Sequence, residues 1–170
     1  AELRDAGAST DADALMFRGG YPRIHADQLD PTVTLADYFA TYVERDLRAL
    51  VALRNLDEFR RFVRLAAGRV GQVLNLHSLA ADVGISDPTA RAWMSLLEAS
   101  YVVRLLRPWF ANLGKRLVKS PKLYFCDVGL AAWLVGITDV KQLAAHPLRG
   151  HLFENLVVME FVKHALNQGL

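Results

Sequence analysis

The chain has 170 residues, of which 52% are hydrophobic and 22% are charged, and its formal net charge is +2. This length predicts one ordinary domain or two small ones, and the composition is typical of a soluble globular protein rather than a disordered chain. The most apolar stretch, residues 155–166, is interrupted by Glu160, Lys163 and His164, so we expect no membrane-spanning helix. The first residues do not resemble a secretory signal, which favours a cytoplasmic protein.

Cys126 is the single cysteine of the sequence, so it cannot form an internal disulfide. It also lacks the Cys and His neighbours of a zinc site, and we expect it to be a small buried hydrophobe. No other spacing of His, Asp and Glu predicts a metal site.

The charges are distributed unevenly along the chain. Residues 1–30 contain six acids and three arginines, whereas residues 99–126 contain six bases and no acid. The six bases are Arg104, Arg107, Lys115, Arg116, Lys119 and Lys122. A basic segment in a nearly neutral chain predicts a patch, whose meaning depends on the structure that carries it.

Residues 1–30 are rich in Ala, Gly and Asp without a sustained period, which predicts an irregular N-terminal segment. From Thr34 apolar residues recur at intervals of three and four, which predicts an amphipathic helix ending near Leu53. Asn55 is a suitable N-cap for a second helix that ends at the glycines of residues 68–71. We therefore expect these two helices to form a helical hairpin over residues 31–71.

Residues 76–83 and 87–100 have the spacing of a helix-turn-helix. Gly84 is able to adopt the left-handed turn conformation, Ser86 caps the second helix, and Trp93 faces the first. Residues 101–107 and 122–126 read as strands. Two strands after a helix-turn-helix predict a winged helix over residues 72–127, in which the basic segment forms the wing.

The last part, residues 128–170, predicts three helices, at 128–135, 139–145 and 149–167, and the fold class is therefore mainly α. The final helix has a wide apolar side, formed by Leu152, Phe153, Leu156, Val157, Phe161 and Leu166. Such a side either packs on the preceding domain or belongs to a piece of a longer protein, and we favour the second interpretation.

Six segments of the chain, in this order, carry a family resemblance: FRGGYP at 17–22, YVERD at 42–46, the helix-turn-helix at 79–98, NLGKR at 112–116, SPKLYFCDVGL at 120–130 and GHLFENLV at 150–157. Together they resemble the C-terminal domain of unknown function that follows the ATPase module in a large family of bacterial and archaeal AAA+ type ATPases. The resemblance implies a winged-helix module attached to a nucleotide-driven motor, with ATP and magnesium bound by the parent protein.

This chain departs from a complete ATPase because it contains no Gly-x-x-x-x-Gly-Lys-Ser/Thr phosphate-binding motif. We therefore expect no catalysis and no cofactor in this chain. Relatives look as though they continue into a restriction-endonuclease-like region, and residues 128–170 would then be its truncated start. Glu154 would lie on the first helix of that region, without the further carboxylates that a metal-dependent nuclease needs.

For nucleic acid, most simply DNA, the sequence places Thr89 and Arg91 at the groove and Lys115, Arg116 and Lys119 of the wing on phosphates. The alternative function is a scaffold that binds a protein partner or a second copy of the chain and regulates the ATPase; a purely architectural role is a third. We expect Trp93, Trp109 and Trp133 to pack in the core or at the edge of the wing rather than to stack on bases.

Overall fold

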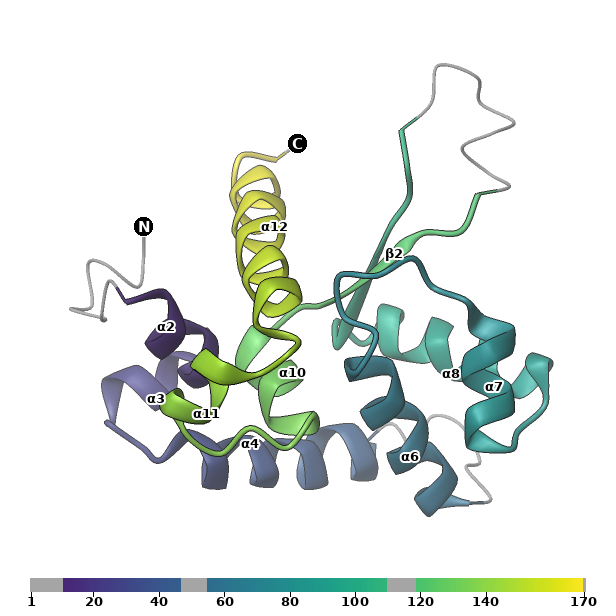
Figure 1. The fold of residues 1–170 in the computed structure, drawn as a ribbon, viewed down its shortest axis with the longest axis horizontal. Coiled ribbons are helices and arrows are strands. Elements are labelled where there is room, and N and C mark those ends of the chain that lie inside the picture. The colour runs from purple at the N-terminus through teal and green to yellow at the C-terminus, as the bar shows by residue number, and fades with distance from the viewer. Residues whose placement is uncertain (1–10, 47–54, 110–118, 170) are drawn as a thin grey trace.

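The computed structural model describes residues 11–46, 55–109 and 119–169, and its fold is mainly α, as the sequence predicts (Figure 1). The chain begins with helices α2 (Ala12–Arg18) and α3 (Pro22–Ala26), where we expected irregular structure. Both are too short to show a helical period, but Met16 and Ile24 are fully buried and Asp11 caps α2. The prediction of an irregular segment is therefore wrong for these residues, because burial of a few side chains stabilises helices that periodicity does not reveal.

The long helix predicted from Thr34 consists of α4 (Pro31–Tyr38) and a π-helical continuation, η1 (Phe39–Asp46). Its predicted end near Leu53 lies outside the described residues. Helix α6 (Leu56–Ala67) follows, and the Asn55 side chain accepts hydrogen bonds from two backbone N–H groups of its first turn, which confirms the predicted cap. Helix α10 (Val128–Leu134) packs against both α4 and α6, so a late segment of the chain joins the helices of the predicted hairpin.

Helices α7 (Leu76–Val83) and α8 (Asp87–Ala99) form the predicted helix pair. Gly84 has φ 85° and ψ 28°, the left-handed conformation that lets the chain turn between them, and Ser86 accepts a hydrogen bond from the Thr89 N–H. The Trp93 ring makes edge contacts with Phe59 and Phe62 at centroid distances of 5.3 and 5.5 Å, which fixes α8 against α6.

Strands β1 (Val103–Leu106) and β2 (Lys122–Phe125) form an antiparallel pair in which Val103 opposes Phe125 and Leu106 opposes Lys122. The other edge of β2 is also paired. The Leu123 carbonyl accepts from the Gly71 N–H and its N–H donates to the Gln72 carbonyl, at 2.8 and 3.0 Å. The segment just before α7 therefore covers β2 on the side away from β1.

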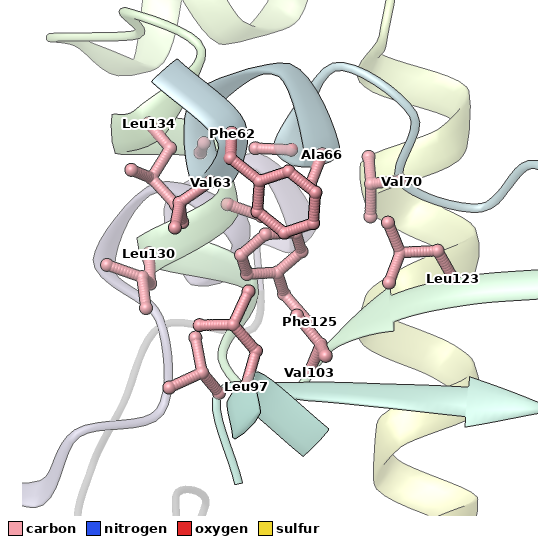
Figure 2. Close-up of a cluster of buried hydrophobic side chains, with 14 of the residues drawn as sticks. Phe62, Val63, Ala66, Val70, Leu97, Val103, Leu123, Phe125, Leu130 and Leu134 are labelled. Atoms are coloured by element: carbon pink, nitrogen blue, oxygen red, sulfur yellow. The ribbon is translucent and has the colours of Figure 1, made fainter. Parts of the chain in front are cut away.

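The chain ends in α10, α11 (Val140–Ala145) and α12 (Arg149–Asn167), within one or two residues of the predicted bounds. Helix α2 packs against all three, so the first and last helices belong to the same body. Figure 2 shows the centre of the core, where side chains from α6, α8, α10 and the sheet converge, among them Phe62, Leu97, Phe125 and Leu130. No helix in the described part of the chain is long and apolar enough to cross a membrane.

Candidate functional site

The basic segment predicted as a wing is described at its two ends. Beyond the last residue pair of the sheet, Leu106 and Lys122, the chain continues without strand structure through Arg107 and Trp109 on one side and Lys119 on the other. We call Leu106, Arg107, Trp109 and Lys119 the sheet end; all four side chains are exposed. Figure 1 shows both strands leaving the helical body toward this end. Lys115 and Arg116, two of the predicted phosphate contacts, lie outside the described residues.

The other predicted contacts, Thr89 and Arg91, lie together near the start of α8. The Thr89 hydroxyl is 2.8 Å from the Ser86 hydroxyl, so it takes part in the helix cap. The Arg91 guanidinium is exposed and 3.9 Å from the Asp87 carboxylate, which is also 3.0 Å from Nδ1 of His77. No hydrogen bond or ion pair within the described ranges connects these residues to Lys119.

The outer surface of α8 carries little that could read bases. Arg91 is the single basic residue of this helix, and the other exposed positions are Pro88, Ala92, Ser95 and Ala99. Nucleobases are read by side chains that donate and accept hydrogen bonds at the groove edges. Of the two described parts of the predicted interface, the sheet end carries more exposed basic residues, Arg107 and Lys119, than α8 does.

The sheet is fixed to α12 by two neighbouring residues of that helix. The buried Asn155 amide accepts from the Phe125 N–H at 2.7 Å and donates to the Phe125 carbonyl at 3.0 Å. The amide thus provides hydrogen-bond partners for the backbone of β2 at the point where its pairing with residues 71–74 ends. This role could not be predicted from sequence, because a mid-helix Asn has no local partner that would mark it.

Glu154, which the resemblance would place on the first helix of a nuclease-like region, supports the same contact. Its Oε1 accepts from Nζ of Lys122 at 2.7 Å and from the Tyr124 hydroxyl at 2.5 Å. The hydrogen bond from Lys122 lowers the pKa of Glu154, and burial, together with the bond to Glu154, raises the pKa of Tyr124. Nowhere among the described residues do three His, Cys, Asp or Glu side chains gather in a way that could hold a metal ion.

A buried carboxylate connects two more of the motifs. Asp127 accepts from the Gly20 N–H at 2.6 Å and from the Leu130 N–H at 2.8 Å, so it caps α10 and holds the loop between α2 and α3. Burial raises the pKa of Asp127, and these hydrogen bonds oppose that rise. A Cβ on Gly129 would lie 2.6 Å from the Gly19 nitrogen, so the two backbones meet where only glycine fits. The FRGGYP and CDVGL segments are thus structural partners.

The adjacent Cys126 is partly buried, as expected of a small hydrophobe, and burial raises the pKa of its thiol to about 11. A thiol with a raised pKa is a weak nucleophile at neutral pH.

A surface groove of about 680 Å³ lies beside α3 and α4, and Tyr21, Tyr38, Asp30 and Asp37 are among the residues that line it. The centroids of the Tyr21 and Tyr38 rings are 4.6 Å apart, and burial raises the pKa of Tyr21. Arg23 also lines this groove, so its wall carries charges of both signs.

The sequence profile of a domain of unknown function, DUF8612, matches residues 9–141, which include the helix pair and the sheet end. The chain belongs to the DUF8612 family. It is 37% identical over 158 residues to uncharacterised proteins of Mycobacterium tuberculosis and Mycobacterium bovis, an alignment that covers 92% of this chain and 36% of each relative. This DUF8612 chain therefore spans about a third of the curated relatives that it matches. No solved structure matches it. The family description and the names of the relatives mention neither an ATPase nor a nuclease.

Proposed function

We propose that this DUF8612 chain is a non-catalytic winged-helix region that couples an AAA+ type ATPase module of its parent protein to nucleic acid, most simply DNA. The order of elements supports the winged-helix interpretation. A helix pair with a glycine turn is followed by two antiparallel strands, and the segment before the pair adds to the edge of β2. The two strands themselves extend away from the helical body (Figure 1).

The observation that carries the nucleic-acid proposal is the exposed, basic sheet end. Arg107 and Lys119 are exposed there, and residues 99–126 contain six bases and no acid. Exposed basic residues attract the phosphate backbone and release its counterions. The exposed surface of α8 has few hydrogen-bonding side chains that could contact the edges of nucleobases. This supports binding with little sequence preference.

The ATPase module is proposed from the resemblance of the six motifs. The relatives are long enough to hold such a module, because 36% of each aligns with this chain. The two glycine-containing motifs that meet at Asp127 join the N-terminal helices to α10 and, through α10, to the core beneath the sheet. Movement of an upstream module would reach the sheet through this packed route.

Fluorescence anisotropy with a labelled duplex and a labelled single strand, each of about 20 nucleotides and in about 50 mM salt, tests the proposal. We expect binding by the chain and at least about tenfold weaker binding by the Lys115→Ala, Arg116→Ala, Lys119→Ala variant. A matched control removes three exposed arginines elsewhere, Arg23, Arg60 and Arg64, and changes the net charge equally. Absence of binding, or equal losses in both variants, would show that the basic segment, residues 99–126, is not a nucleic-acid site.

A second candidate function, the scaffold that associates with a protein or with its own copy, is favoured by one observation on α12. Phe153, Val157 and Phe161 recur every four residues on this helix and are 45%, 38% and 72% exposed. Exposed apolar stripes of this kind mark interaction surfaces. Sedimentation should then detect a dimer that Phe161→Glu weakens, while the matched change Ala92→Glu on α8 leaves it intact. A monomer at high concentration would remove this candidate.

A further inference from the structure

The surface groove beside α3 and α4 is separate from the proposed nucleic-acid interface. Its volume of about 680 Å³ lies within the range of about 300–1,000 Å³ that is typical of ligand sites. Helices α3 and α4 lie toward one end of the molecule and the strands toward the other (Figure 1). A ligand in this groove would therefore leave the sheet end accessible.

One face of α4 and its continuation η1 forms the length of the groove. Four of the lining residues, Asp30, Thr34, Asp37 and Thr41, are spaced by three or four positions and so share this face. At a helical rise of about 1.5 Å per residue the four positions span about 16 Å, and Asp30 and Asp37 are separated by about 10 Å along the axis. An extended peptide of about five residues has the same length.

The charges of the groove favour a cationic partner. Asp37 is exposed, and Asp30 caps α4 through Oδ1, which accepts from the Val33 N–H at 3.0 Å. Arg23 also lines the groove, but its Nε is 3.6 Å from the Asp27 carboxylate, which offsets the charge of the guanidinium. The groove thus has a formal excess of negative charge, divided between two positions on α4.

Between these two positions the groove is apolar and partly aromatic. Val33 is 60% exposed there, and the Tyr21 and Tyr38 rings pack against each other with a centroid distance of 4.6 Å. Aromatic-lined grooves bind proline-rich segments in the polyproline II conformation. That helix has three residues per turn and a rise of about 3.1 Å, so residues three positions apart face the same side at a separation of about 9 Å. This separation matches the spacing of Asp30 and Asp37.

We propose that this groove binds a proline-rich protein segment with two basic residues three positions apart, of the type Arg-Pro-Pro-Arg. The two guanidinium groups lie at Asp30 and Asp37, and the prolines contact Tyr21, Val33 and Tyr38. The inference goes beyond the proposed function, because it adds a protein partner at a second surface. A polyproline II segment is largely ordered before it binds, so its association costs little conformational entropy.

Fluorescence anisotropy with a fluorescein-labelled peptide, in which prolines flank Arg-Pro-Pro-Arg, tests the inference. Asp37→Lys should weaken binding about 3- to 30-fold, because it replaces an attraction between surface charges with a repulsion. Val33→Arg, at an exposed position, should also weaken binding, because it places a cation in the apolar part of the groove. Glu160→Lys makes the same charge change as Asp37→Lys on an exposed position of α12 and should leave the affinity unchanged.

Two further probes test whether the spacing of the charges matters. A peptide of the same composition with the sequence Arg-Pro-Arg should bind more weakly, because its two cations no longer reach both carboxylates. Spermidine at the concentration of the peptide should displace little of it. Absence of binding, equal affinity for both peptides, or equal effects of Asp37→Lys and Glu160→Lys would overturn the inference. Complete displacement by spermidine would also overturn it, since any polycation would then fit the groove.

Discussion

Asp127 is a buried residue with a distant partner, since its carboxylate joins the loop at Gly20 to the start of α10. Asn at this position could accept one of the two hydrogen bonds, but its amide N–H₂ would then face the other N–H. We expect Asp127→Asn to lower the free energy of unfolding by about 1–3 kcal/mol, the cost of an unpaired buried donor.

Urea denaturation measures this effect, and Asp139→Asn is the matched control. Asp139 also caps a helix, α11, but accepts from Gln142 at the surface, and Asn is an equally good N-cap. A loss of stability in both variants, or in neither, would contradict the role of Asp127 in holding the loop.

Asn155 has the corresponding role for the sheet, because its amide satisfies both backbone groups of Phe125. Asn155→Ala leaves these groups buried without partners, and we expect it to lower the free energy of unfolding by about 2–4 kcal/mol. Hydrogen exchange identifies the cause: the Phe125 amide should exchange faster in the variant, with less change at Leu123, which donates to Gln72. Equal protection of the Phe125 amide in both proteins would show that α12 does not pair with β2.

At the scale of elements, the contact between α12 and β2 should depend on pH. The pKa of Glu154 is lowered by Lys122, so the stability that this carboxylate contributes is present above its unfolded pKa, about 4.3, and is lost as pH falls through the lower folded value. Unfolding midpoints between about pH 6 and 3 should therefore fall more steeply in the unmodified chain than in Glu154→Gln. Parallel curves would mean that the bond with Lys122 does not contribute.

The elements also show which features are predictable from sequence. Asn55, Gly84 and Ser86 act on their own helix ends, so local rules located these helices and turns. Local rules missed α2 and α3, whose stability comes from burial of Met16 and Ile24, and the π-helical turn that follows α4. They also missed the partners of Asn155 and Asp127, 30 and 107 residues away, and the exposure of Trp109, because these depend on how distant segments meet.

At the scale of the whole molecule, the chain places a basic, projecting sheet end on a body held together by its first and last helices. We expect this chain to bind no ATP, because it lacks the glycine-rich loop and lysine that cradle phosphates. Calorimetry with ATP and magnesium should detect no heat of binding. A micromolar affinity would show that the chain contains part of a nucleotide site and would contradict its separation from the ATPase module.

The salt dependence of nucleic-acid affinity tests the central claim most directly, because it counts the phosphates that the basic segment, residues 99–126, contacts. With three to five phosphates engaged on a duplex, the logarithm of affinity should fall against the logarithm of salt concentration with a slope of roughly −3 to −4.5. The Lys115→Ala, Arg116→Ala, Lys119→Ala variant should flatten this slope by about two to three units without a change in the unfolding midpoint. A slope near zero, or the same slope in the variant, would contradict contact between these bases and nucleic acid.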